Sequence, residues 1–188
     1  MTERRDAIAS IEIPLALADD GLDRRGLLLG WDSARAARYA EALVAEIEAN
    51  AGSFDDLLVR AVALGGGTAT LLGRHAAPVM AALRASCPVA EDAPVTATAA
   101  VANISGATFP FFRRAGITRF DFEMLSLNSA DFTMVNKVDN LADFPVVCDH
   151  FLHAYTNDSL GVVLAYGYES ERPEDALIAV RRSALAAA

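Results

Sequence analysis

The chain is poor in cysteine: only Cys87 and Cys148 occur among its 188 residues. Two cysteines so far apart in the sequence provide no disulfide framework. A scarcity of cysteine is typical of proteins that work in a reducing compartment. We therefore expect a cytoplasmic protein whose fold is held together by its core alone.

Positive charge and long apolar runs are also in short supply. Lys and Arg number 16 against 25 Asp and Glu, which gives a formal net charge of -9 and a pI near 4.7. A field of this sign repels the phosphates of nucleic acids and of anionic lipids. The first apolar run, Ile11–Leu17, is interrupted by Glu12 and Pro14, so it is too short for a signal peptide or a membrane span. We expect neither a nucleic acid nor a membrane as a partner.

The chain has no low-complexity run and no linker rich in Pro, Gly or Ser. With 53% hydrophobic residues it can bury a substantial core. The simplest domain organisation is therefore a single domain over residues 1–188.

The hydrophobic patterns alternate between the periods of strands and helices. Strands are predicted at 11–17, 58–64, 95–102, 119–126 and 160–168, and helices at 33–50, 75–85, 105–115, 141–155 and 173–187. Five alternations predict an α/β fold with a parallel sheet and crossover helices. We expect a partial (β/α) TIM-like barrel of about five units, with an open doubly wound flavodoxin-like sheet as the alternative. Because five units leave both sheet edges unpaired, we also expect a homodimer.

Several single residues mark where the predicted helices begin and end. Asp32 or Ser33 can cap the first helix by accepting a hydrogen bond from a free backbone N–H. Gly116 suits the left-handed backbone that ends many helices. Pro145 is compatible with a helix only in its first turn.

Three adjacent glycines and a threonine, Gly65 to Thr68, follow the second predicted strand. Backbone N–H groups at a junction between a strand and a helix attract carboxylates and phosphates, which predicts a small anionic ligand. The other interpretation is that glycine is needed there for a positive φ or for close packing. The sequence favours neither interpretation.

The fourth predicted strand carries two carboxylates on one face. Side chains alternate across a strand, so Asp121 and Glu123 point one way and Phe120 and Phe122 the other. The apolar face should pack under helices, which leaves the acids in the barrel interior, about 7 Å apart. They are our candidate catalytic residues, as acid and base or as cation ligands. The alternative is that they are hydrated or paired with Arg119 or Arg60.

One helix carries a second group of polar residues, Cys148, Asp149, His150 and His153. Histidines three residues apart on a helix are a spacing that metal sites use. The group lies in the C-terminal half of its helix, away from the rim where barrel active sites are built. We therefore predict surface histidines and no metal site.

No single motif identifies a protein family, but the order of the motifs along the chain resembles that of a known family. A strand that ends in GGGT, the stretch AGITRFDFEMLS and a late apolar strand that ends in YG resemble the oxygen-independent coproporphyrinogen III oxidase-like branch of the radical S-adenosylmethionine (SAM) enzymes. The matching residues are Gly65, Gly66, Gly67, Thr68, Ala115, Gly116, Arg119, Ser126, Tyr166 and Gly167. The resemblance covers nearly the whole chain from Ile11 onward, and it implies a partial (β/α) barrel.

The same resemblance implies a site. In that family the glycine turn contacts the amino end of SAM, and the third and fourth strands line the cofactor cleft. Cofactor contacts are thereby assigned to Gly65, Gly66, Gly67 and Thr68, and to Thr98, which stands near the family's glutamate.

The chain departs from the family where the iron–sulfur cluster is held. The C-x3-C-x2-C loop of that family follows the first strand, and here that place reads LALADDGLDRRG, without cysteine. Cluster irons need thiolate ligands, and Cys87 and Cys148 lie outside this loop. Ala69 also replaces the proline after GGGT, and Leu125 replaces a glutamine. We expect no [4Fe–4S] cluster, and the lost contacts argue against SAM binding.

Three functions are compatible with these observations. The first, which we favour, is a catalytically degenerate homologue of the family that binds a small ligand or a partner, such as a radical SAM relative. The second is an oxidoreductase of the oxygen-independent coproporphyrinogen III oxidase type. The third is another enzyme that reuses the cleft through Asp121 and Glu123. Whether the chain is an enzyme stays open at this stage.

Overall fold

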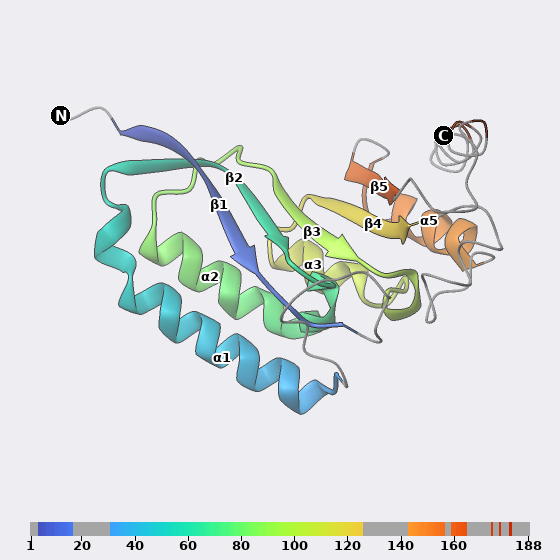
Figure 1. Cartoon of the computed structure of the whole chain (residues 1–188), viewed down its shortest axis with the longest axis horizontal. Coiled ribbons are helices and arrows are strands. Elements are labelled where there is room, and N and C mark those ends of the chain that lie inside the picture. Colours follow the sequence, from blue (N-terminus) through green and yellow to red (C-terminus); the bar gives the residue numbers. More distant parts are fainter. Residues whose placement is uncertain are drawn as a thin grey trace.

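The computed structural model of the chain describes residues 4–16, 31–125, 143–156 and 159–164, together with residues 174, 177 and 181. These residues form a five-stranded sheet in which all neighbouring strands are parallel (Figure 1). The strands are β1 (Arg5–Glu12), β2 (Leu57–Gly65), β3 (Val95–Ala99), β4 (Arg119–Leu125) and β5 (Leu160–Leu164). Their spatial order, β1-β2-β3-β4-β5, is the order of the sequence.

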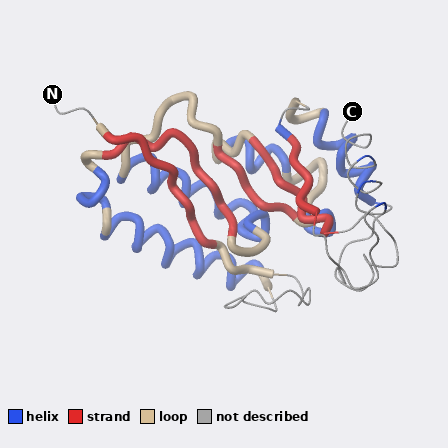
Figure 2. The backbone as a smooth tube through the Cα atoms, turned by 45° about the horizontal axis from the view of Figure 1, so that its top comes forward, coloured by secondary structure: helices blue, strands red, loops and turns tan. Residues whose placement is uncertain are grey.

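The helices α1, α2 and α3 lie along one face of this sheet, as Figure 2 shows. The α-helices are α1 (Ser33–Ala49), α2 (Ala76–Ser86), α3 (Phe109–Arg114) and α5 (Phe144–Leu152). Short 3-10 helices connect them, namely η1 (Ala51–Phe54), η2 (Ala69–His75) and η3 (Val101–Asn103). Within the described ranges, no helix combines the length and the apolar character that crossing a membrane requires.

Strand order decides between the two expected architectures. A flavodoxin-like sheet has its first two strands exchanged and helices on both faces. The sequential order found here, with helices α1 to α3 on one face, is that of a β/α barrel. The α/β fold with a parallel sheet ordered as in a partial TIM-like barrel is thus confirmed, and the doubly wound alternative is wrong. That residues 1–188 form a single domain stays a prediction.

Most of the expected elements agree with the structure, and the first strand is the main exception. It was expected at Ile11–Leu17 but spans Arg5–Glu12, because Arg5 already pairs with Leu57 of β2. The run after it, which contains Ile13 and Leu15, is buried but lies beyond the strand. The last expected helix and the end of the fifth strand lie largely outside the described residues.

The local signals for helix ends are confirmed. The Asp32 side chain accepts a hydrogen bond of 2.7 Å from the backbone N–H of Arg35, and so caps α1. Gly116 follows α3 with a φ of 81°, a left-handed conformation that suits glycine. Pro145 lies in the first turn of α5.

An aromatic cluster fills the space between β4 and the helices α3 and α5. Its members are Phe109, Phe112, Phe120, Phe122, Phe144, Phe151 and Tyr155. Phe120 is at its centre, fully buried, with ring centroids 5.6 Å from Phe109 and 5.2 Å from Tyr155. Edge-to-face contacts of this kind add stability beyond the buried area. This cluster attaches the β4 side of the sheet to its helices.

The cluster leads to a test of fold stability. Replacement of Phe120 by alanine should lower the free energy of unfolding by about 3–5 kcal/mol, since it leaves a large cavity among aromatic rings. Phe111 on α3 is 40% exposed, so Phe111→Ala is the matched control and should cost less than about 1 kcal/mol. Urea unfolding followed by circular dichroism measures both. Equal losses in the two variants would contradict the central role of Phe120.

Candidate functional site

The residues expected at the site lie in one row across the sheet, which begins at the carboxyl ends of β1 and β2. The turn Gly65–Thr68 follows β2, and Thr98 lies on the neighbouring strand β3. Asp121 of β4 is in register with Thr98, and Gly161 of β5 is in register with Asp121. The structure therefore brings together the glycine turn, Thr98 and Asp121, which are far apart in the sequence.

The glycines of this turn have a steric reason of their own. Gly66 has a φ of 82°, which side chains rarely adopt. A Cβ atom on Gly67 would lie 2.6 Å from the carbonyl oxygen of Leu15 and 2.7 Å from that of Ile13. The turn thus passes so close to the backbone after β1 that only glycine fits at Gly67.

Hydrogen bonds within the chain use much of the polar surface of the turn. The hydroxyl of Thr98 donates to the carbonyl of Gly67 and accepts from the N–H of Ala69 at 3.0 Å. The N–H of Thr68 donates to the carbonyl of Leu15 at 2.8 Å. Two N–H groups that could meet an anion are therefore already bonded.

A carboxylate already lies beside the turn. A Cβ atom on Gly66 would collide with the Glu12 carboxylate. A second negative charge at that position would be repelled. The geometry thus supports the packing interpretation of the glycines, and the anionic ligand stays a prediction.

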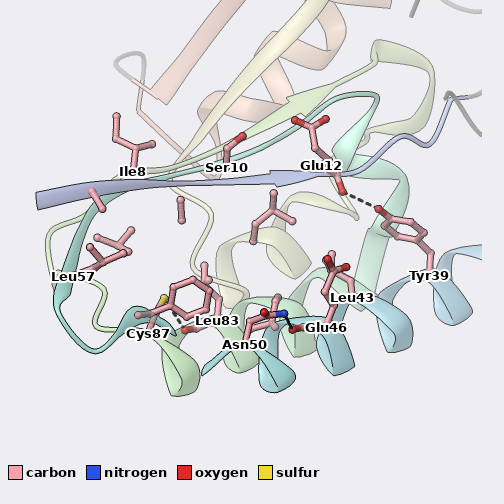
Figure 3. Close-up of a pocket in the computed structure, with 16 residues that line it drawn as sticks. Ile8, Ser10, Glu12, Tyr39, Leu43, Glu46, Asn50, Leu57, Leu83 and Cys87 are labelled. Atoms are coloured by element: carbon pink, nitrogen blue, oxygen red, sulfur yellow. Dashed lines mark hydrogen bonds between the residues drawn. The ribbon is translucent and has the colours of Figure 1, made fainter. Parts of the chain in front are cut away.

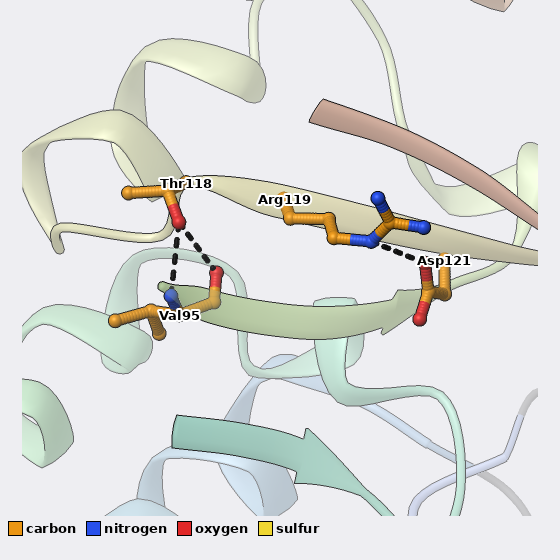
Figure 4. Close-up of polar contacts among 4 residues, drawn as sticks. All are labelled: Val95, Thr118, Arg119 and Asp121. Atoms are coloured by element: carbon orange, nitrogen blue, oxygen red, sulfur yellow. Dashed lines mark hydrogen bonds and ion pairs between the residues drawn. The ribbon is translucent and has the colours of Figure 1, made fainter. Parts of the chain in front are cut away.

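Asp121 takes part in an ion pair on the concave face of the sheet. Its Oδ1 lies 3.0 Å from Nε of Arg119, two residues earlier on β4 (Figure 4). Arg60 instead pairs with Asp6, with 2.9 Å between Nε and Oδ1. Of the two pairings considered for the strand's carboxylates, the one with Arg119 is therefore confirmed for Asp121.

The ion pair needs a glycine on the next strand. A Cβ atom on Gly161 would collide with Oδ1 of Asp121. The role of Gly161 was not recognised from the sequence, although a glycine inside a strand often marks a close approach by another group. Figure 4 also shows the hydroxyl of Thr118, which accepts from the N–H of Val95 at 2.9 Å and ties the start of β4 to β3.

The predicted alternation along β4 is confirmed. Phe120, Phe122 and Met124 are fully buried under the helices. Asp121 and Glu123 are half-buried on the other face, and Glu123 is in register with Val163 of β5. The assignment of catalytic roles to these two carboxylates stays a prediction.

The two thiols do not form a ligand set for an iron–sulfur cluster. Cys87 ends α2 and Cys148 lies within α5, and both are buried. Burial raises the pKa of Cys87, and it raises that of Cys148 to about 11, so both are neutral thiols at physiological pH. The Cys87 thiol also donates to the carbonyl of Leu83 at 3.2 Å. The loop after β1, residues 17–30, lies outside the described residues, and its sequence has no cysteine.

The polar group on α5 is spread around the helix. Cys148 is buried, whereas Asp149, His150 and His153 are exposed. Nδ1 of His153 lies 2.7 Å from the backbone oxygen of Asp149. Within the described part of the chain, no three His, Cys, Asp or Glu residues are grouped as a metal site requires.

The comparisons with known proteins agree with the fold. No protein-family model and no curated protein sequence matches the chain. Among solved structures, the chain is similar to coproporphyrinogen III oxidase (HemN) from Escherichia coli, described as a radical SAM enzyme, with a TM-score of 0.80 and 22% sequence identity. The match covers 99% of this chain and 43% of that one. The chain thus has the fold that the motif order predicts, over less than half the length of that enzyme.

The close approach at Gly67 can be tested by substitution. Gly67→Ala should lower the free energy of unfolding by about 2–3 kcal/mol, because a methyl group there meets backbone oxygens that cannot rotate away. Gly52 in η1 is exposed and has open space around it, so Gly52→Ala should stay within about 0.5 kcal/mol of the wild type. Chemical denaturation compares the three proteins. A Gly67→Ala variant as stable as the Gly52→Ala variant would disprove the steric role.

Proposed function

We propose that the chain is a catalytically degenerate relative of the coproporphyrinogen III oxidase-like radical SAM enzymes that holds no [4Fe–4S] cluster and serves as a ligand-binding or partner protein. The fold supports the relationship, with a TM-score of 0.80 to HemN. The absence of cysteine from the loop after β1 supports the loss of the cluster. A cytoplasmic location and assembly with a second copy or a radical SAM relative belong to the same proposal.

The main support for the proposal is that the polar side chains of Thr98 and Asp121 are hydrogen-bonded within the chain. Thr98 stands near the family's glutamate, and its hydroxyl bonds the backbone of Gly67 and Ala69. Asp121, in register with Thr98, is bonded to Arg119. A site adapted to SAM needs such groups as partners for the polar atoms of the bound ligand. A buried polar atom of the ligand without a partner would cost binding free energy. Here the groups are bonded to the turn and to the sheet.

The face of the sheet that points away from the helices offers polar groups to a ligand or a partner. The concave face is left with half-buried charged residues such as Arg119 and Asp121. A ligand or a partner that covers this face would find polar groups already oriented by their pairing.

The loss of the cluster is directly testable. After anaerobic reconstitution with iron and sulfide, the purified protein should show no absorbance near 400 nm and should bind less than about 0.2 iron atoms per chain, since the loop supplies no thiolate. It should also leave SAM intact in the presence of dithionite. A radical SAM enzyme reconstituted in parallel is the positive control. A brown product with about four irons per chain that cleaves SAM would refute the proposal.

The binding role needs its own measurement. A thermal-shift panel of tetrapyrroles, nucleosides and SAM should identify at least one compound, other than SAM, that raises the melting temperature. A ligand at about 100 times its Kd adds about 2.7 kcal/mol, which corresponds to roughly 5–10 °C for a chain of this size. Asp121→Asn, which weakens the pair with Arg119, tests whether the concave face is the binding surface. If no compound produces a shift, the small-ligand half of the proposal fails and the partner half remains.

A further inference from the structure

A cavity of about 600 Å³ lies between the edge strand β1 and the helix α1, on the side of the sheet that faces the helices (Figure 3). Its walls come from β1, from the second half of α1, from η1 and the start of β2, and from the end of α2. The glycine turn, Thr98 and Asp121 do not line it. Only Glu12 of β1 belongs both to the lining of the cavity and to the surroundings of the glycine turn.

The cavity exists because β1 presents small side chains to α1. The helix-facing residues of β1 include Ala7 and Ala9, where a larger residue would fill the space. Near the middle of α1, the Tyr39 hydroxyl ties the helix to the strand, because it donates to the carbonyl of Glu12 at 2.8 Å. The gap between strand and helix remains open beyond that contact.

The walls are mainly apolar, and three of the polar groups among them already donate a hydrogen bond within the chain. Asn50 donates its amide to the carbonyl of Glu46 at 2.8 Å, and the thiol of Cys87 donates to Leu83. The hydroxyl proton of Tyr39 is likewise committed to Glu12. No Lys, Arg or His lines the cavity. What the cavity offers a ligand is therefore an apolar surface together with hydrogen-bond acceptors.

Two residues of the lining carry a carboxylate, Glu12 and Glu46, and the carboxylate of Glu12 lies beside Gly66. The carboxylate of Glu46 extends from α1 toward β1 at the open side of the cavity, as Figure 3 shows. Burial, Glu46 and Glu12 together raise the pKa of the Tyr39 hydroxyl, which indicates a negative potential at this end. A ligand that enters here gains most if it brings a positive charge.

We propose that this cavity binds a small molecule with an apolar, ring-sized body and a protonated amine or amidine. The body lies against Leu43, Phe54 and Leu57, and the cation lies beside Glu46. The volume is in the range of about 300–1,000 Å³ that is typical of ligand pockets. The carboxylate repels anions of the same size, and neutral molecules lack the ionic hydrogen bond.

Three naphthalene probes of nearly equal size test the charge preference. We expect 1-naphthylmethylamine to bind at least about tenfold more tightly than 1-naphthylmethanol, and 1-naphthoate to bind least, by isothermal titration calorimetry at low salt. Glu46→Gln should remove most of the preference for the amine. Glu48→Gln is the matched control, because Glu48 is exposed on the same helix and does not line the cavity.

A second variant tests the location. Ala9→Leu places an apolar side chain in the cavity and should abolish binding of all three probes, while the melting temperature stays the same or rises. Equal affinity of the amine and the alcohol, or an unchanged preference in Glu46→Gln, would overturn the assignment of a cationic ligand. Unchanged binding in a folded Ala9→Leu variant would overturn the site itself.

Discussion

The backbone of the turn after β2 lies against the backbone after β1 at a distance that only glycine allows. The carbonyls of Ile13 and Leu15 occupy the space that a Cβ on Gly67 would need. Two hydrogen bonds close the contact, from Ile13 N–H to Gly65 at 2.6 Å and from Thr68 N–H to Leu15 at 2.8 Å. The chain therefore remains bonded to the turn after β2 for three residues beyond the end of β1. This contact fixes one end of the row of residues that crosses the sheet.

The residues next to this contact follow one another in register across strands β3, β4 and β5. Thr98 on β3 bonds both sides of the turn, so the second and third strands are fixed relative to each other. Asp121 follows in register on β4, and Gly161 leaves room for it on β5. Each strand thus contributes one residue to a row that crosses the sheet. On the other face the row has no polar equivalent, because Phe120 and its neighbours are packed under helices.

Elements fixed by local signals could be predicted from the sequence. The helix expected at 33–50 spans Ser33–Ala49, because its apolar period and the Asp32 cap are both local. The first strand could not be placed, because charged Arg5 belongs to it only through its partner Leu57 on a distant segment. Edge strands tolerate such charges, so the strand predicted from the hydrophobic pattern began at Ile11 and not at Arg5.

The sequence predicted the face of the sheet on which the carboxylates of the site lie, but not the ion pairs that they form. Alternation along β4 placed Asp121 on the concave face, but whether Arg119 or Arg60 would pair with the strand's carboxylates depended on strand register. A register shift between Ala7 and Ile8 changes which residues of β1 and β2 are adjacent, and Arg60 pairs with Asp6 there. The cavity under β1 depends on where α1 lies relative to the edge strand. No periodicity in the sequence encodes that placement.

The packing of this fold does not depend on an iron–sulfur cluster. An iron–sulfur cluster is held by a few thiolates in one loop, whereas the sheet is held by the buried face of five strands. Loss of the thiolates removes no side chain from that face, so it costs the fold little. The glycine turn would also persist, because Gly67 is required by the approach of Ile13 and Leu15. The packing of the sheet and of the glycine turn therefore needs these residues whether or not a cofactor is bound.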